Sequence, residues 1–355
     1  MTSSTNAARS TLIPTDTSIV VRVVFLYVGQ GSSILVLFRN GSEYRTLLVD
    51  INLHAKASGI DVPKLLKDLL GSNPLHAFVN THPHDDHLTG IKELDKTVTI
   101  SEVWHSDHKP TKKHGERYDD LLEIIDRLDD SKVRILKGSD SAENLGDAEI
   151  HFLAPAEYVN DDVNEDDAEN RYQRIHENCG VLKIGKDSSW VLVTGDADLV
   201  AFRDHITEHH QDRLGAYVLD AAHHGSRSFF VAEEGDEPYR DHIDAISPSF
   251  IVVSAPKNSE SRHEHPHEDA LKLYAEYGTV LKMGPKRECY VCDIHEDGTA
   301  DDPWSDEGKL VAAYGLADDD GGGKSDGGGG GKRGGLAGPF VKPSAPAVPR
   351  DGRYA

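Results

Sequence analysis

Residues 81–90 read THPHDDHLTG, and the six positions from His82 to His87 contain three histidines and two aspartates. The apolar run LHAFVN just before them is typical of a short strand. If the chain leaves that strand extended, His82 and His84 point to the same side and can hold one divalent ion. Asp86 and His87 then lie where the chain turns into the next helix, and they can face a second ion. A solvated loop or a packing role does not explain this spacing, because ionisable side chains are costly to bury unless they are paired or metal-bound.

The composition is that of a globular protein, with 355 residues of which 37% are hydrophobic and 28% are charged. This length predicts one large domain with tails. No window approaches the roughly 18 apolar residues that a membrane-spanning helix needs. The amino terminus also lacks the apolar core of a secretory signal, so we expect a cytoplasmic protein with no membrane partner.

Cysteine usage agrees with a reducing compartment. Cys179, Cys289 and Cys292 are too few for a disulfide framework. Cys289 and Cys292 form a CxxC pair, but a lone pair lacks the second pair of ligands that a structural zinc site requires. We therefore expect these two cysteines to have a structural role.

Strand and helix patterns fill residues 18–312 in two successive halves, each with the makings of a sheet and helices on one side. This predicts two sheets packed face to face with helices outside. Residues 1–17 and the Gly- and Pro-rich residues 313–355 are expected to be disordered. The acidic stretch at about 156–171 is expected to be a solvated insertion, because like-charge runs without an apolar anchor tend to stay solvated.

Several motifs, taken in order, resemble those of the metallo-β-lactamase superfamily. HPHDDH matches its HxHxDH signature, Asp50 closes the strand TLLVD, and Asp196 stands in VLVTGD. The segments YVGQGSS, AAHHGS and HEHPHEDALKLY look like those of the branch related to the ComEC/Rec2 competence proteins. The resemblance covers about residues 18–300. It implies an α/β fold, the metallo-β-lactamase-like αββα four-layer sandwich, and metal-dependent hydrolysis.

Carried over to this sequence, the resemblance implies a two-metal site. His82 and His84 would bind one ion, Asp86 and His87 the other, and Asp196 would bridge them, with Asp50 supporting the ligands from behind. One of His223 and His224 would supply a further ligand, and the sequence does not say which. Many family members have another histidine between the cluster and the bridging acid. Here no candidate stands in a recognisable context, so a one-metal enzyme stays open; the candidates are His105, His108, His114, His151 and His176.

The chemistry follows from these ligands. Two divalent ions about 3.5 to 4 Å apart can activate a shared water for attack on a phosphorus or carbonyl centre. Histidine and carboxylate ligands suit Zn²⁺, two per chain, or Mn²⁺. Asp86 and Asp196 would be catalytic as well as metal-binding, and His265 and His267 could bind a phosphate oxygen or protonate a leaving group. Ser226 and Arg227 are candidate substrate contacts.

The resemblance favours a phosphodiesterase or nuclease. Hydrolysis of a carbonyl ester, lactone or thioester is the alternative, and a non-catalytic binding module of the same fold is a third. A formal net charge of -23 opposes binding of long nucleic acids unless a basic rim surrounds the site. Candidate rim residues are Arg227, Lys257, Arg262, Lys282, Lys286 and Arg287. The sequence carries no indication of oligomeric state.

Overall fold

The structure, a computed structural model, describes residues 3–53, 59–113, 115–255, 261, 264–284 and 286–316. Within this part of the chain the strands form two sheets. The first has the order β15-β14-β1-β2-β3-β4-β5-β6, with β1 Ile19–Phe25, β2 Ile34–Asn40, β3 Glu43–Val49, β4 Ala77–Asn80, β5 Val103–His105, β6 Val133–Ile135, β14 Tyr290–His295 and β15 Trp304–Ser305. The second has the order β13-β12-β11-β10-β9-β8-β7, with β7 Glu143–Leu145, β8 Ala148–Ala154, β9 Val181–Lys186, β10 Ser189–Val193, β11 Val218–Asp220, β12 Phe250–Val253 and β13 Thr279–Lys282.

Each sheet is antiparallel on one side and parallel on the other. In the first sheet β14, β1, β2 and β3 pair antiparallel, whereas β3, β4, β5 and β6 run parallel. In the second, β7 to β10 pair antiparallel and β10 to β13 run parallel. The parallel strands are joined through helices, as parallel connections require.

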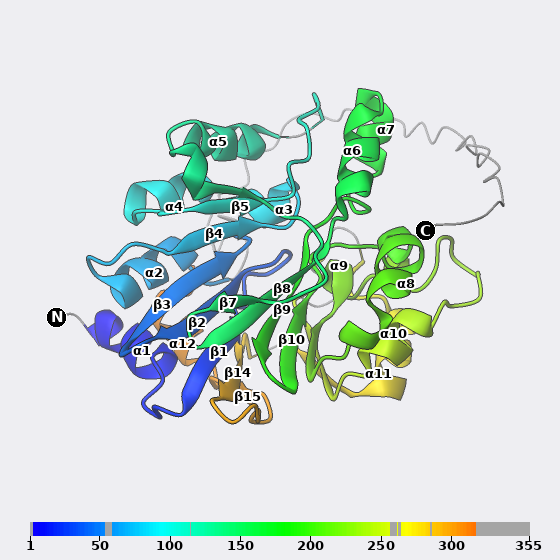
Figure 1. Ribbon diagram of the computed structural model, residues 1–355. Helices are drawn as coiled ribbons and strands as arrows, with labels where there is room; N and C mark the ends of the chain where they lie inside the picture. Colours follow the sequence, from blue (N-terminus) through cyan, green and yellow to red (C-terminus); the bar gives the residue numbers. More distant parts are fainter. Residues whose placement is uncertain are drawn as a thin grey trace, which may run out of the picture. The chain divides into compact units, whose positions relative to one another are not determined.

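Helices cover the outer face of each sheet, and Figure 1 shows them on opposite sides of the strands. On the first sheet they are α1 Ser3–Leu12, α2 Val62–Leu70, α4 Ile91–Thr97, α5 Glu116–Ile125 and α12 Lys309–Tyr314. On the second they are the π-helical turn Ala201–Ile206, α8 Thr207–His210, α10 Asp241–Ile246 and α11 Glu268–Tyr277. Short 3-10 turns lie at Asp130–Lys132, Gln211–Arg213 and Arg227–Phe229, and the short helices α3 Asp85–Leu88 and α9 Ala222–Gly225 follow strand ends.

Burial confirms that the sheets pack face to face. Along β10, Val191 and Val193 belong to the core that includes the first sheet, whereas Leu192 lies in a second core with helix residues such as Phe202 and Ile243. Alternate strand residues point to opposite faces, so β10 has one sheet on one side and helices on the other. The αββα four-layer sandwich expected from the sequence is therefore confirmed.

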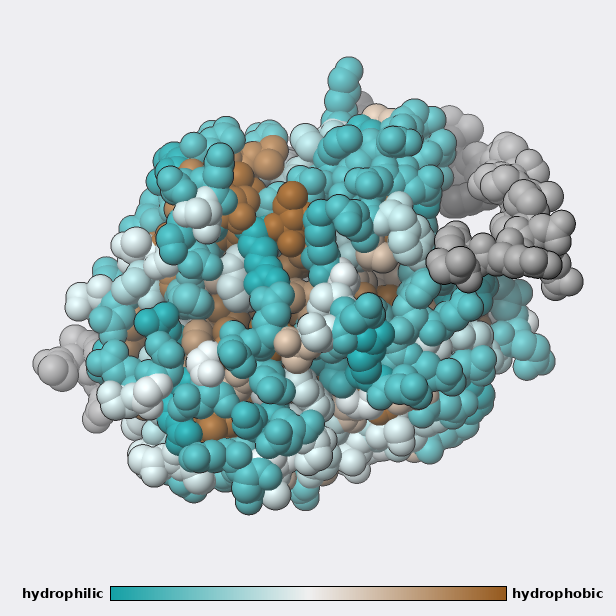
Figure 2. All heavy atoms as spheres, viewed as in Figure 1, coloured by the Kyte–Doolittle hydropathy of each residue, from teal (hydrophilic) through white to brown (hydrophobic). Residues whose placement is uncertain are grey.

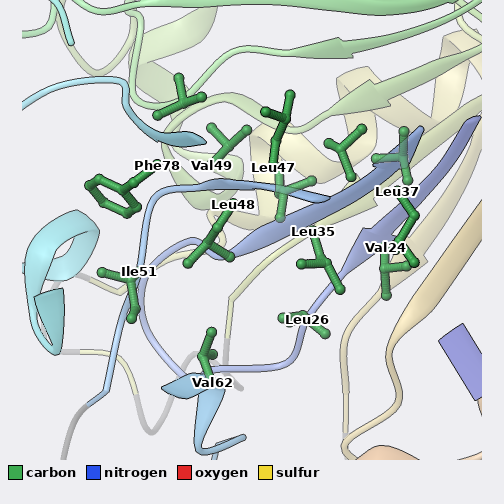
Figure 3. Packing of buried hydrophobic residues seen from close by; sticks show 14 of the residues in the cluster. Val24, Leu26, Leu35, Leu37, Leu47, Leu48, Val49, Ile51, Val62 and Phe78 are labelled. Carbon is green, nitrogen blue, oxygen red and sulfur yellow. The ribbon is translucent and has the colours of Figure 1, made fainter. Parts of the chain in front are cut away.

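The first sheet is apolar on both faces because it too lies between a sheet and helices. Val24, Leu35 and Leu48 are register partners on β1, β2 and β3. Figure 3 shows them on the side of the sheet where Val62 begins α2. At the start of α2 the Asp61 side chain accepts from the Lys64 amide at 3.0 Å, and Gly71 ends the helix at a φ of 65°.

Three boundaries differ from expectation. Residues 1–17 are not disordered throughout, since Ser3–Leu12 form α1, whose Ala8 and Leu12 are fully buried in the main core. The acidic insertion is also folded, because α6 Glu157–Glu165 places the apolar pair Val159 and Val163 on one buried face. It is followed by α7 Ala168–Gln173.

The carboxyl-terminal boundary lies later than residue 313. The helix α12 runs to Tyr314, whose side chain is 1% exposed, and Gly315 forms a bridge with Ile60. The Gly- and Pro-rich residues from 317 onward lie outside the described residues. Cys289 and Cys292 are free and fully buried in the core, which agrees with the structural role expected for them.

Figure 2 shows a face that is mostly hydrophilic, with small separate apolar areas. No helix among the described residues combines the length and the apolar character that crossing a bilayer requires.

Candidate metal centre

The predicted ligands gather where strands of both sheets end. Asp50 directly follows β3, His82 comes two residues after β4, and Asp196 comes three residues after β10. His223 and His224 follow β11 in the short helix α9. The carboxyl ends of parallel strands form the edge at which α/β folds commonly bind ligands, and both sheets contribute to that edge here.

One group of donors consists of Asp86, His87, Asp196 and His224, whose ligand atoms all lie within 4.8 Å of one another. The Nε2 atom of His87 lies 3.1 Å from Oδ1 of Asp196. The Nε2 atom of His224 lies 3.4 Å from that same oxygen and 3.4 Å from Oδ2 of Asp86. Two imidazoles and two carboxylates therefore point at one small volume.

A second group consists of His82, His84, His176 and Asp196, again within 4.8 Å. The Nδ1 atom of His84 lies 3.1 Å from Nε2 of His82 and 3.2 Å from Nε2 of His176. The Nε2 atom of His82 lies 3.5 Å from Oδ2 of Asp196. Since the first group faces Oδ1 of Asp196 and the second faces Oδ2, this carboxylate is placed between the two groups.

The side chain of Asp50 supports the first group from behind. Its Oδ2 atom lies 2.7 Å from Nδ1 of His87 and accepts from the Thr81 hydroxyl at 2.7 Å. Its Oδ1 atom accepts from the Thr81 amide at 2.8 Å and from the Asn80 side chain at 3.2 Å. A carboxylate that holds the far nitrogen of a histidine fixes the ring's orientation and directs its other nitrogen toward a metal.

The backbone of the HHG turn separates the roles of its two histidines. His223, His224 and Gly225 all have positive φ, at 50°, 56° and 80°. This conformation is strained for the two histidines, and such strain is typical of functional sites. The turn directs His224 into the first group. His223 belongs to neither group, although its Nε2 atom lies 3.5 Å from Oδ2 of Asp196; its ring lies 4.5 Å from the ring of His176 and 4.8 Å from that of His265.

Burial and neighbouring charges shift the pKa values of the clustered histidines in opposite directions. Burial opposes protonation of His87, but the carboxylates of Asp196 and Asp50 outweigh it and hold its pKa well above the ordinary value. Burial and the charge of His87 lower the pKa of His82 well below the ordinary value. Burial would raise the pKa of Asp196, yet the surrounding histidines, His223 foremost, hold it well below its usual range. The shared carboxylate is therefore ionised.

These residues fit divalent metal ions. Among the described residues, the buried oxygen Oδ1 of Asp196, which faces the first group, has no hydrogen-bond partner. Ionisable side chains are rarely buried at this density unless a metal or a counter-charge compensates them. Imidazole nitrogens and carboxylate oxygens are donors that divalent transition metals accept. The site can thus hold one ion in each group, with Asp196 common to both.

His265 lies beside the cluster, and His267 lies next to it. His265 is 6% exposed, and its amide donates to the Ser261 hydroxyl, which in turn donates to Gln30 at 2.7 Å. The ring of His267 is 4.9 Å from that of His265. These contacts leave His265 facing His223, where it could exchange a proton with a bound substrate.

Ser226 and Arg227, predicted to touch substrate, both have partners within the protein. The Ser226 hydroxyl lies 3.1 Å from that of Ser228, which lies 3.1 Å from Nδ1 of His223. The Arg227 guanidinium pairs with the exposed carboxylates of Glu234 at 2.9 Å and Asp269 at 3.2 Å. Ser226 therefore helps to orient His223, and two carboxylates offset the charge of Arg227.

The segment YVGQGSS reaches the metal loop through its backbone. Gly31 has a φ of 122°, and a Cβ atom at this position would lie only 2.5 Å from the carbonyl oxygen of Asp86. The amide of Ser32 donates to that same oxygen at 3.3 Å. The residues after β1 are thus packed against the turn that carries Asp86.

The sequence placed His176 among five candidates without distinguishing it, and the structure brings it to His84. Its position just before the strand CGVLKIG could have identified it as a ligand, because the segment that enters this strand lies at the same edge of the sheets as the other ligands. His105 lies at the end of β5, His108 beside Asn178, and His151 on β8; none of the three belongs to either group.

Part of the predicted basic rim cannot be placed. Lys257 and Arg262, as well as His114, lie outside the described residues. Lys282 ends the edge strand β13. Lys286 and Arg287 follow it at the beginning of the segment that leads to β14.

No family model and no curated protein matches the sequence. Solved structures resemble the fold at low identity. CmlA, a diiron β-hydroxylase from Streptomyces venezuelae, is 17% identical over 74% of this chain, which spans 53% of CmlA, with a TM-score of 0.42. Igni18, a metallo hydrolase from Ignicoccus hospitalis, is 16% identical over 76% of this chain and 98% of its own, with a TM-score of 0.39. A metallo-β-lactamase from Cronobacter sakazakii is 12% identical over 56% of this chain and 73% of its own, with a TM-score of 0.31.

Proposed function

We propose that the protein is a metal-dependent hydrolase and that its substrate is a phosphodiester. The observation that carries this proposal is the position of Asp196, whose two carboxylate oxygens face two separate groups of donors. Bound ions would supply Lewis acidity and an activated water to a substrate at this position. The imidazole-rich donor set favours Zn²⁺, and Mn²⁺ is the second candidate.

The donor residues would divide between two ions. His82, His84 and His176 would hold one ion, Asp86, His87 and His224 the other, and Asp196 would keep the two at a fixed spacing. His265 would exchange a proton with a bound substrate, because it lies beside His223 without belonging to either group. The resemblance of AAHHGS and HEHPH to the ComEC/Rec2-related branch is the reason for preferring a phosphodiester.

One observation favours a carbonyl ester, lactone or thioester instead. Arg227, the basic residue next to the HHG turn, is paired with Glu234 and Asp269. This leaves less fixed positive charge for a phosphate anion than the sequence suggested. With a net charge of -23, the protein is also a poor match for long nucleic acids, so a small phosphodiester is preferred over DNA.

The test is a substrate panel on protein freed of metal and reloaded with Zn²⁺ or Mn²⁺. The panel contains bis-p-nitrophenyl phosphate, p-nitrophenyl phosphate, a lactone and a thioester, with Asp196→Asn as the inactive control. We expect turnover of the diester that Asp196→Asn abolishes. Turnover of the lactone or thioester alone would replace the proposal with the carbonyl alternative. Stoichiometric metal without any turnover would favour a binding module.

A further inference from the structure

The segment expected to be a solvated acidic insertion is attached to the metal centre. Arg174, just after α7, donates from Nε and Nη2 to the two oxygens of Glu177, both at 2.6 Å. Its Nη1 atom donates to Asp166 at 2.7 Å, and Nη2 also lies 2.8 Å from Asp162. Asp162 lies in α6 and Asp166 follows it, so one guanidinium joins the insertion to the residue after His176.

A second set of contacts holds Asn178, two residues after His176. Asn178 is fully buried, and its side-chain oxygen accepts from Asn160 of α6 at 3.3 Å. Asn160 also donates to the carbonyl of Ser106, and the amide of Asn178 donates to the carbonyl of Arg174 at 3.2 Å. The residues on both sides of His176 are therefore bonded to helix α6 or to the turn after it.

We propose that helices α6 and α7 form a clamp that positions His176 in its donor group, with Arg174 as the positioning residue. The proposal rests on the proposed function only in requiring a metal-binding site, not any particular substrate. The other donor group is independent of the clamp, because Asp86, His87 and His224 lie on α3 and α9, and the carboxylates that Arg174 pairs with among the described residues are Asp162, Asp166 and Glu177. Loss of the clamp would therefore weaken binding of the ion in the His176 group and leave binding of the other ion unchanged.

The balance of charge explains why a single arginine matters. Arg174 is surrounded by three carboxylates, and Glu177, the one next to His176, is 8% exposed. Without the guanidinium these carboxylates repel one another, and a buried charge loses its partner. Glu177 retains His205, whose Nε2 lies 3.0 Å from its Oε1, but a single imidazole does not reach Asp162 and Asp166 as Arg174 does. Separation of these groups would draw His176 away from His84.

The experiment compares the two metal affinities in the full-length chain. Parent, Arg174→Gln and Arg174→Lys are freed of metal and titrated with Zn²⁺ against a competing chelator, and Co²⁺ absorption reports the ligand sphere. His176→Ala identifies the equivalent that depends on His176. The matched control is Arg203→Gln, because Arg203 pairs with its exposed neighbour Asp204 and lies outside the clamp.

We expect Arg174→Gln to weaken the His176-dependent equivalent at least tenfold, the order of effect that residues behind a metal ligand have, and to leave the other unchanged. Arg174→Lys should recover part of the loss, since it keeps the charge without the forked geometry. Adding Asp162→Asn and Asp166→Asn to Arg174→Gln should also recover part, by removing repulsion. Two affinities equal to those of the parent would overturn the proposal.

A general loss of structure would give a different result. If Arg174→Gln or Arg174→Lys weakened both equivalents together and lowered the melting temperature of the metal-free protein, Arg174 would be a structural residue and the proposal would be wrong. A parent that binds two ions but hydrolyses no substrate would overturn the proposed function while leaving these affinities fully readable.

Discussion

Nδ1 of His87 lies 2.7 Å from Oδ2 of Asp50. Since an ionised carboxylate can only accept a hydrogen bond, this contact fixes the ring with Nε2 turned toward Asp196, 3.1 Å away. Asp50 itself is 1% exposed and is held by Thr81 and Asn80. The orientation of His87 thus depends on a residue 37 positions earlier in the chain.

Replacing Asp50 with Asn should weaken metal binding without removing a ligand. The neutral amide holds Nδ1 of His87 less strongly, so we expect the affinity of the group with Asp86 and His224 to fall about 10- to 100-fold. Chelator competition measures this. Asp85→Asn is the matched control, because Asp85 adjoins the ligands but is exposed and belongs to neither group. Equal affinities in both variants would reduce Asp50 to a packing role.

The two acidic ligands should differ in what their loss removes. Asp196→Asn should abolish binding of both ions, because both groups share this carboxylate, whereas Asp86→Ala should abolish turnover and remove one ion only. Elemental analysis after gel filtration gives the metal content per chain. Two ions retained in Asp196→Asn would contradict a shared ligand. A large loss of thermal stability in metal-free Asp86→Ala, relative to the metal-free parent, would show that Asp86 is structural.

The end of α12 should be needed for stability. Tyr314 is 1% exposed and its hydroxyl donates to Asp68 at 3.1 Å, so Tyr314→Ala should lower the free energy of unfolding by about 3 kcal/mol. Denaturant unfolding checks this, with Tyr158→Ala as the control because Tyr158 is 52% exposed. Truncation after Ala312 should be at least as costly as Tyr314→Ala. An unchanged unfolding midpoint after that truncation would contradict the buried position of α12.

Acid should destabilise the protein partly through His242. This ring is fully buried against Phe229 and Tyr239, and burial lowers its pKa to about 3. The unfolded chain binds the proton near pH 6.5 and the folded protein does not, so stability falls as the pH drops below about 6.5 and continues to fall until about pH 3. Between pH 7 and pH 5 this one group should cost about 2 kcal/mol.

The substitution His242→Phe should remove that part of the pH dependence, because phenylalanine cannot be protonated. Unfolding free energies of the metal-free protein at pH 7 and pH 5 measure it, and exposed His209→Phe serves as the control. If His242→Phe lost as much stability between these pH values as the parent, the acid sensitivity would have to come from other groups.

Much of the site could be predicted from the sequence because many of its residues lie close together in the chain. His82, His84, Asp86 and His87 follow one strand, and their spacing alone predicts that they gather. Asp196 and Asp50 could be assigned because their segments resemble those of the metallo-β-lactamase superfamily, and in the structure each stands just beyond the end of an apolar strand. The paired sheets followed from the two successive strand and helix patterns.

Other features depend on contacts that no local pattern expresses. Two consecutive left-handed residues, His223 and His224, bring the side chain of His224 into the first donor group. The sequence HHG favours a left-handed conformation only at the glycine. His176 reaches its group through the clamp formed by α6 and α7, and the four-residue spacing of Val159 and Val163 was hidden among acidic residues. The helix α1 was missed because its apolar face, with Ala8 and Leu12, is short.

Gly31 has consequences for how this chain tolerates mutation. A β-carbon there would collide with the carbonyl oxygen of Asp86 and with the side chain of Asn52, and the φ of 122° is unfavourable for any other residue. The position carries no functional group, yet a saturation library selected for activity should be depleted at residue 31 nearly as strongly as at the ligands themselves. Natural substitutions in this protein are therefore limited at Gly31, where no side chain fits, as well as at the metal-binding residues.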